Sequence, residues 1–137
     1  MGDKEIRVVA AVIARDGRYL ITQRRDEAVL PGLWEFPGGR IEAGEDDAQA
    51  LAREVRARVG VDLEVSGKLA ERRHDYDRYS VTLALYSCRL PEGAEPQALH
   101  VRDVRWVTSA EFASYPFPPA DQATMDLLLA AGCDRQT

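Results

Sequence analysis

The residues best suited to chemistry lie in one stretch near the middle of the chain. The run Pro37-Gly38-Gly39 breaks regular structure, and its glycines let the backbone approach a neighbouring group closely. Further on, the carboxylate of Glu54 and the guanidinium of Arg58 are four residues apart, a spacing that places them on the same side of a helix. Carboxylate oxygens bind hard cations and guanidinium groups bind phosphate, so this stretch predicts a site for a phosphate ligand, a divalent cation or both.

A helix must position these two side chains, and the sequence marks both of its ends. Asp46, three residues before Gln49, is typical of a capping box, and Gly60 ends the pattern, so we expect a helix over roughly residues 46–59. Helical spacing predicts a buried stripe made of Ala48, Leu51, Ala52, Val55 and Val59. The adjoining face, which carries the chemistry, comprises Ala50, Glu54, Ala57 and Arg58.

The stretch resembles the signature of the Nudix hydrolases, in which a glycine, a glutamate, an Arg-Glu pair, two further glutamates and a closing glycine recur at fixed spacing. The matching residues are Gly39, Glu45, Arg53, Glu54, Val55, Gly60 and Val61. This sequence has Ala57 and Arg58 where the family has its paired glutamates. The resemblance implies an α/β fold, the Nudix-type α/β/α sandwich with a mixed curved sheet, formed as a single domain of residues 1–137.

The resemblance also implies a metal-dependent reaction. In the family, glutamates on one helix face hold Mg²⁺ or Mn²⁺ against a diphosphate, and a carbonyl of the glycine turn assists. Carried over to this sequence, Glu54 is the catalytic carboxylate and binds the metal with Gly38, while Glu45 pairs with Arg53 as structural support. A lone carboxylate leaves most of the coordination shell to water and phosphate, so we expect Mg²⁺ or Mn²⁺ to be weakly bound.

Arg58 allows two interpretations. Four residues after Glu54, it is placed for a surface ion pair worth about 0.2–0.5 kcal/mol. Alternatively, its guanidinium replaces the positive charge of the missing metal and binds phosphate directly. In the second interpretation, Arg58, Arg24 and Gly39 form the phosphate-binding part of the site.

A second candidate catalytic residue is His100. Many members of the family carry another glutamate about six residues before the tryptophan of a late strand, and that spacing from Trp106 leads to His100. An imidazole can act as a base or a ligand near neutral pH. An isolated histidine is more often an ordinary surface residue, however, and Asp103 is the nearest carboxylate that could take its place.

Two further stretches resemble the MutT-like branch of the family, which hydrolyses nucleoside triphosphates to monophosphates and pyrophosphate. The first is Leu33 to Gly39, preceded by Thr22 to Arg25, and the second is the run Tyr115 to Asp121. In that branch the residue at the Asp121 position reads the base, and aspartate is typical of the cytidine triphosphate pyrophosphohydrolases. An ionised aspartate only accepts hydrogen bonds and would select a base edge with donors, whereas the alternative is an acid at a helix start. Phe36 either contacts the base or packs in the core.

The remaining elements follow from alternation and turn signals. Residues 5–14 and 18–24 flank Asp16-Gly17, which predicts a β-hairpin, and residues 26–39 are expected to be mostly loop. Further strands are expected near residues 61–71, 79–89 and 101–107. Thr108 with Glu111 predicts a short helix, and a terminal helix is expected over residues 121–131.

Composition limits the other possibilities. A chain of 137 residues with 45% hydrophobic and 30% charged residues is typical of a single soluble globular domain. Its net charge of -5 argues against a nucleic-acid polymer as partner. No secretion signal and no long apolar run are present, so we expect a cytoplasmic protein, without a membrane partner, that is a monomer or homodimer.

These observations favour a nucleoside triphosphate pyrophosphohydrolase that is weak because its metal-ligand positions are Ala57 and Arg58. A nucleotide-binding or sensing protein that has lost catalysis is the alternative, as is a Nudix-fold interaction module without a small ligand. Metal-dependent turnover separates the first function from the other two. Nucleotide binding without turnover separates the second from the third.

Overall fold

The computed structural model describes residues 4–27 and 31–117. Its elements are, in chain order, β1 (Lys4–Arg15), β2 (Arg18–Gln23), β3 (Trp34–Glu35), β4 (Gly38–Arg40), α1 (Asp47–Val59), β5 (Glu64–Asp75), β6 (Tyr79–Arg89), β7 (Asp103–Val107) and the 3₁₀ helix η1 (Ser109–Ser114). The short strands β3 and β4 lie in the stretch that we expected to be mostly loop. They exist because they pair with β2 and β1, which are distant in sequence.

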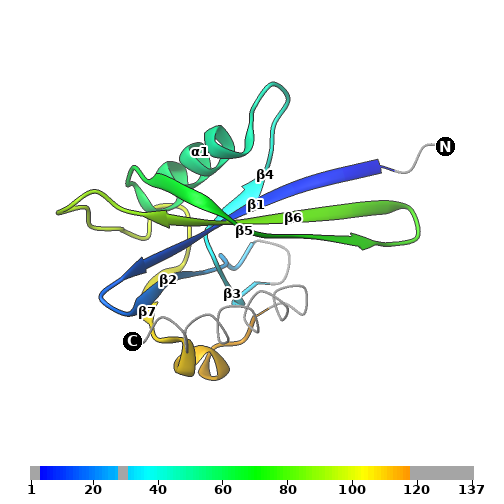
Figure 1. Cartoon of the computed structure of the whole chain (residues 1–137). Coiled ribbons are helices and arrows are strands. Elements are labelled where there is room, and N and C mark those ends of the chain that lie inside the picture. Colours follow the sequence, from blue (N-terminus) through cyan, green and yellow to red (C-terminus); the bar gives the residue numbers. More distant parts are fainter. Residues whose placement is uncertain (1–3, 28–30, 118–137) are drawn as a thin grey trace.

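A mixed sheet joins the strands, and β1 is its central member. β1 runs parallel to β6 from the pair Lys4↔Tyr79 to the pair Ile13↔Cys88, and the other recorded strand pairs are antiparallel. The strand order is β3-β2-β1-β6-β5, with β4 also paired to β1 and β7 to β2 (Figure 1). The expected mixed sheet is therefore confirmed.

The hairpin between β1 and β2 is also confirmed. Its two turn residues, Asp16 and Gly17, have φ values of 53° and 77°. A two-residue hairpin turn of this kind needs positive φ at both positions, which Asp-Gly tolerates better than most pairs. The turn sets the register, in which Arg15 faces Arg18.

Helix α1 begins and ends where the sequence predicted. Asp46 and Gln49 form both hydrogen bonds of a capping box, and Gly60 takes a left-handed conformation with φ of 74°. Its buried residues are Ala50, Leu51, Val55 and Val59. The predicted burial of Ala48 and Ala52 is wrong, because both are exposed, and Ala50 lies in the core instead of on the chemical face. An alanine methyl buries little area, so the larger Leu51, Val55 and Val59 decide which side of the helix faces the sheet.

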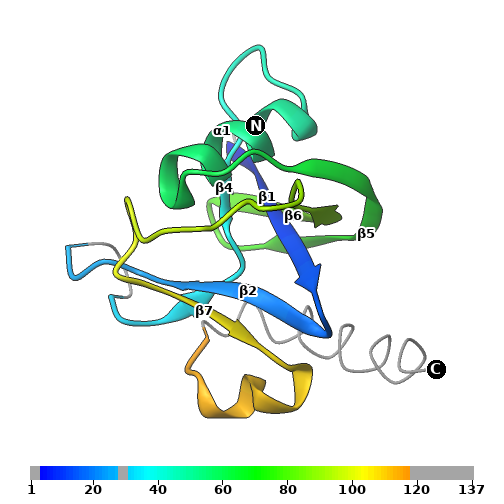
Figure 2. The same cartoon turned by 90° about the vertical axis from the view of Figure 1, so that its left-hand side faces the viewer.

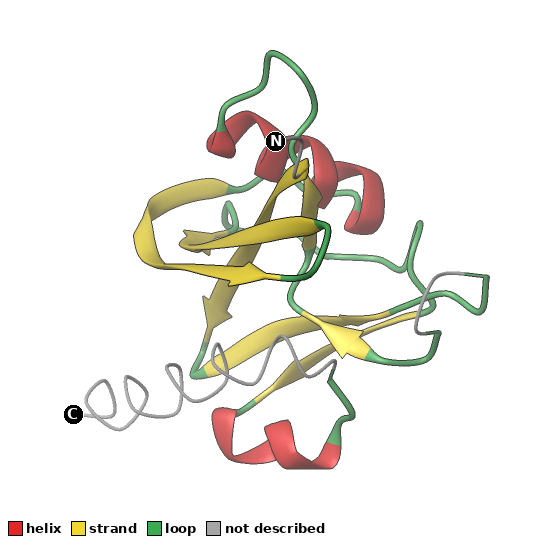
Figure 3. Ribbon diagram, turned by 90° about the vertical axis from the view of Figure 1, so that its right-hand side faces the viewer, coloured by secondary structure: helices red, strands yellow, loops and turns green. Residues whose placement is uncertain are grey.

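Two layers of apolar side chains lie on opposite faces of the sheet. α1 covers one face, where Leu51, Val55 and Val59 belong to the same buried cluster as Val9 and Ile13 of β1. The other face carries an aromatic cluster formed by Tyr19, Trp34, Phe36 and Phe112. Figures 2 and 3 show α1 and η1 on opposite sides of the strands. This arrangement places α1 next to β1 and β4, with Glu54 of α1 against Gly39 of β4.

Near the end of the described chain, Thr108 and Glu111 form the predicted capping box and open η1. The predicted terminal helix over residues 121–131 lies outside the described residues, as does Asp121. Among the described residues, no helix is long and apolar enough to cross a membrane.

Candidate functional site

The site is built where α1 approaches β4. The carboxylate of Glu54 lies so close to Gly39 that a methyl group on that glycine would come within 2.5 Å of its carboxyl carbon. On the neighbouring Gly38, a methyl group would lie 2.0 Å from the backbone oxygen of Val9. The two glycines therefore allow two close approaches at once, of a carboxylate to β4 and of β4 to β1.

Both carboxylate oxygens of Glu54 are bound by guanidinium groups. Nε of Arg58 donates to Oε1 at 2.8 Å, and Nη1 of Arg53 donates to Oε2 at 3.0 Å. The Glu54 side chain is only 14% exposed, so these charge-assisted hydrogen bonds are largely shielded from water. Each oxygen of the Glu54 carboxylate thus already accepts one charge-assisted hydrogen bond.

Arg53 in turn is fixed by Glu45. Its Nε and Nη2 donate to the two oxygens of the Glu45 carboxylate at 2.6 and 2.9 Å, and Nη2 also donates to the backbone oxygen of Arg40 at 3.0 Å. The hydrogen bonds from Arg53 lower the pKa of Glu45 to about 2. The frame formed by Glu45, Arg53 and Glu54 therefore ties the loop before α1 to the middle of the helix and to β4.

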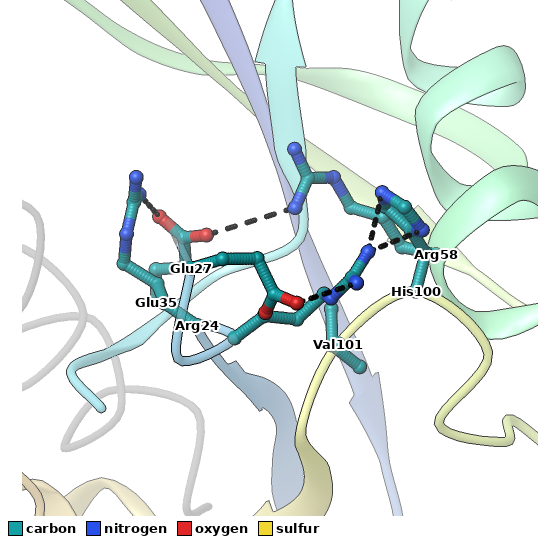
Figure 4. Close-up of a pocket in the computed structure, with 7 residues that line it drawn as sticks. Arg24, Glu27, Glu35, Arg58, His100 and Val101 are labelled. Carbon is teal, nitrogen blue, oxygen red and sulfur yellow. Dashed lines mark hydrogen bonds and ion pairs between the residues drawn. The ribbon is translucent and has the colours of Figure 1, made fainter. Parts of the chain in front are cut away.

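A pocket of about 210 Å³ opens beside this frame (Figure 4). Its lining residues are Arg24, Arg25, Glu27, Glu35, Arg58, His100 and Val101. Glu35 lies between two of the arginines, with Oε1 accepting from Nη1 of Arg24 at 2.9 Å and Oε2 3.9 Å from Nη1 of Arg58. Three arginines against two carboxylates leave the lining with a positive charge, which suits an anionic ligand.

His100 lines the pocket because its segment of the chain is hydrogen-bonded to the C-terminal end of α1. Its backbone N–H donates to the backbone oxygen of Arg58 at 3.1 Å, and its ring nitrogens lie 3.0 and 3.1 Å from Nη1 of Arg25. Nη2 of Arg25 donates to Glu27 at 2.9 Å. His100 and Arg58 therefore share one wall of the pocket although 42 positions separate them in the chain.

The structure brings together Arg24, Arg58 and His100, three of the residues that the sequence singled out, and it places Glu54 directly behind Arg58. It places Phe36 elsewhere, in the aromatic cluster, where its ring lies 5.8 Å from those of Phe112 and Phe117. That packing accounts for its burial, and a contact with a base stays a prediction.

Asp103, the alternative to His100, is not among the pocket residues. Its carboxylate accepts from the backbone N–H of Val104 and from Arg105 instead. Three further pocket residues, Arg25, Glu27 and Glu35, were not predicted from the sequence. Glu35 could have been found, because in a strand it points away from its buried neighbours Trp34 and Phe36.

A second hollow, of about 440 Å³, lies on the other face of β4. Its lining residues are Lys4, Ile6, Val8, Arg40, Arg78, Tyr79 and Val81. Gly39 faces Glu54, so its neighbour Arg40 points to the opposite side of the strand. Lys4, Arg40 and Arg78 form no ion pair within the described part of the chain. A floor of aliphatic side chains with a tyrosine and three free cations suits an organic anion.

In this arrangement the site does not fit a divalent cation at Glu54 and Gly38. A hard cation needs several oxygen ligands, and no group of three or more carboxylate, histidine or cysteine side chains is placed to hold one among residues 4–27 and 31–117. The one carboxylate at the predicted position already accepts hydrogen bonds from Arg53 and Arg58, and the guanidinium of Arg58 lies 2.8 Å from it. A cation would have to displace that guanidinium first.

A family model and individual known proteins both match most of this chain. The family model described as "NUDIX domain" matches residues 8–127. The chain is 34% identical to the CTP pyrophosphohydrolase of Escherichia coli (strain K12) over 128 residues, which are 93% of each chain. It is 39% identical to the putative 8-oxo-dGTP diphosphatase 2 of Mycobacterium tuberculosis (strain ATCC 25618 / H37Rv) over 118 residues, which are 84% of this chain and 82% of that relative.

Solved protein structures also have a fold similar to that of this chain. The solution structure of the E. coli ORF135 protein is similar with a TM-score of 0.82 at 33% identity, over 96% of this chain and 94% of that chain. The MutT protein from Methanosarcina mazei Go1 has a TM-score of 0.80 at 18% identity, over 100% of this chain and 99% of that chain, and at this identity it shows the fold alone.

Proposed function

This chain belongs to the Nudix family, and from that premise we propose that it binds nucleoside triphosphates and hydrolyses them slowly to the monophosphate and pyrophosphate. The observation that carries the proposal is the pocket of Arg24, Arg25 and Arg58 beside the Gly39–Glu54 contact. Guanidinium groups suit phosphate oxygens because they present several donors in one plane. The relatives named above, which are described as acting on nucleoside triphosphates, support the choice of ligand.

Binding would use both sides of β4. In the proposal, the phosphates lie against the arginines of the pocket, and the hollow around Arg40 and Tyr79 takes the nucleoside, whose sugar and base match its apolar floor and aromatic ring. The charges on both sides have the sign that a polyphosphate requires.

Slow hydrolysis follows from the groups that the site retains. Water attacks a phosphorus atom and gives up a proton to the solvent, the phosphoanhydride bond between the α- and β-phosphates breaks, and the arginines stabilise the negative charge that develops on the leaving group. The Nudix family generally uses divalent metals, and the arrangement around Glu54 does not fit one. Without that ion the site lacks its strongest source of electrostatic stabilisation, so we expect turnover to be slow.

A specific observation also favours a second candidate, nucleotide binding without turnover. Both oxygens of Glu54 are hydrogen-bonded to arginines, so a metal ion or a proton from water would have to compete with two guanidinium groups for this carboxylate. In that case the protein would sense or sequester a nucleotide and leave it intact.

Asp121 is the residue that we propose selects the base of the nucleotide. Asp121 lies outside the described residues, and its role at the base rests on the resemblance stated for residues 115–121. We put cytidine nucleotides first and guanine nucleotides second, since both bases present hydrogen-bond donors to a carboxylate. Whether the protein acts as a monomer or a homodimer stays a prediction.

The decisive experiment combines binding and turnover. Cytidine, guanosine, 8-oxoguanosine and uridine triphosphates are titrated by calorimetry, and pyrophosphate release from each is then measured with and without Mg²⁺. Slow release that Glu54→Gln abolishes and Glu64→Gln leaves unchanged would support hydrolysis; Glu64 is a matched control because it is an exposed glutamate on β5. Binding without release would support the second candidate. Absence of binding would overturn both and leave an interaction module.

A further inference from the structure

Arg58 occupies a position where the family resemblance places a metal-binding glutamate, and its surroundings give it a role of its own. We infer that Arg58 is a built-in counter-cation, so that the site binds a triphosphate in its metal-free form and Mg²⁺ opposes binding. The inference rests on the proposed function, because it assumes a polyphosphate ligand in the arginine-lined pocket.

The geometry holds the guanidinium of Arg58 in place while leaving donors open. Nε is bound to Glu54 of the same helix at 2.8 Å, and Nη1 lies 3.9 Å from Glu35 of β3. At that second distance Arg58 and Glu35 form an ion pair but no hydrogen bond. Neither Nη atom therefore has a hydrogen-bond acceptor among the described residues, and the side chain lines the pocket. Two carboxylates fix the group, and its free N–H donors remain available for phosphate.

The ion pairs of Arg58 differ from an ordinary surface ion pair, and helix α1 carries an example of the latter at Arg56. Arg56, one position before Ala57, pairs with Asp62 outside the pocket, and its side chain is 71% exposed. The Arg58 side chain is 27% exposed and connects the helix to β3 as well as to Glu54. Since exposed pairs are screened and mobile, only the half-buried Arg58 has the fixed position that a binding group needs.

Charge determines the form of the ligand. The magnesium complex of a triphosphate carries two fewer negative charges than the free triphosphate, so arginines attract it less. The carboxylate that would bind the ion is already neutralised by Arg58 and Arg53. Added Mg²⁺ thus removes charge from the triphosphate, and in the described part of the chain no cluster of three or more acidic, histidine or cysteine side chains is placed to hold the ion.

The test is calorimetric titration of the full chain with CTP and with inorganic tripolyphosphate, each in EDTA and in excess MgCl₂. We expect affinity in EDTA to equal or exceed that in MgCl₂, and Arg58→Gln to weaken metal-free binding about tenfold or more, the scale of one charge-assisted hydrogen bond. Arg56→Gln, which removes the same charge from the same helix, should leave binding unchanged. Arg58→Lys, which keeps the charge, should retain more metal-free binding than Arg58→Gln.

Each result separates the inference from the proposed function. Binding that occurs only with MgCl₂, or that Arg58→Gln and Arg56→Gln weaken equally, would overturn the inference while the proposed ligand class stands. A failure of both ligands to bind in either buffer would overturn the proposed function together with the inference. Thermal melting of each variant shows that the comparison is made on folded protein.

Discussion

Replacing Ala57 and Arg58 together by glutamate would restore the acids that the family resemblance places on this face of α1. We expect the variant Ala57→Glu with Arg58→Glu to release pyrophosphate faster than the native chain, and only in the presence of Mg²⁺. Ala57 is exposed, so a glutamate there meets no core, and position 58 already faces the pocket. The change therefore alters charge and ligand number without disturbing the packing of the helix.

The magnitude follows from the position of Arg58. A divalent ion on Glu54 would stand roughly 4 Å from the guanidinium, which at an effective dielectric constant of about 20 corresponds to roughly 8 kcal/mol of repulsion. Because the Arg58 side chain is 27% exposed, screening by solvent reduces this repulsion to roughly a third. The remaining value of about 3 kcal/mol corresponds to about two orders of magnitude in cation affinity. The two added carboxylates contribute ligands beyond that.

The assay is the initial rate of pyrophosphate release from CTP as a function of Mg²⁺ concentration. We expect a rate at least about 100-fold above native at saturating ligand, and its loss when Glu54→Gln is added to the double variant. Arg56→Glu makes the same change of charge as Arg58→Glu, but on the outer side of α1, and should have little effect. A double variant with the native rate and the native Mg²⁺ dependence would refute the reasoning. So would a fast native enzyme that Glu54→Gln abolishes and the double change leaves untouched.

Three further predictions concern stability and specificity. Hydrogen bonds from Arg7 at 2.8 and 2.7 Å lower the pKa of Asp47 from its ordinary 3.8 to about 2. Asp47→Asn should therefore lower the free energy of unfolding in urea by about 2 kcal/mol above pH 4, and the difference between variant and native chain should vanish as the pH falls toward 2. A loss of stability that does not depend on pH would contradict this. Gly38→Ala should lower the free energy of unfolding by about 3 kcal/mol or more, because the added methyl group would lie 2.0 Å from a backbone oxygen of β1. The control is Gly67→Ala, whose methyl group meets nothing within 4 Å. In the same thermal melts it should lower the stability far less. Asp121→Ala should weaken binding of CTP about tenfold or more in calorimetry and leave tripolyphosphate unchanged, and equal losses for both would return Asp121 to a helix-start acid.

The sequence alone determined the features that depend on neighbours along the chain. The ends of α1, the Asp16-Gly17 hairpin and the capping box at Thr108 were predicted because a turn or cap involves only a few consecutive residues. The spacing of Gly39, Glu45, Arg53 and Glu54 predicted the family for a similar reason, since one loop and one helix fix their relative positions. The same spacing placed Arg58 beside Glu54.

Only the tertiary structure decided the features that join distant segments. The strands β3 and β4 exist through pairing with β2 and β1, and the rotation of α1 that buries Ala50 and exposes Ala48 and Ala52 follows from packing on the sheet. Glu35 became part of the site because β3 brings it toward Arg58, and His100 because the chain after β6 returns to the end of α1. Local patterns cannot encode such contacts, since they depend on how several elements pack at once. The sequence therefore supplied the charged groups, and the packing of α1 against β1 and β4, with the pairing of β3 to β2, assembled them into one pocket.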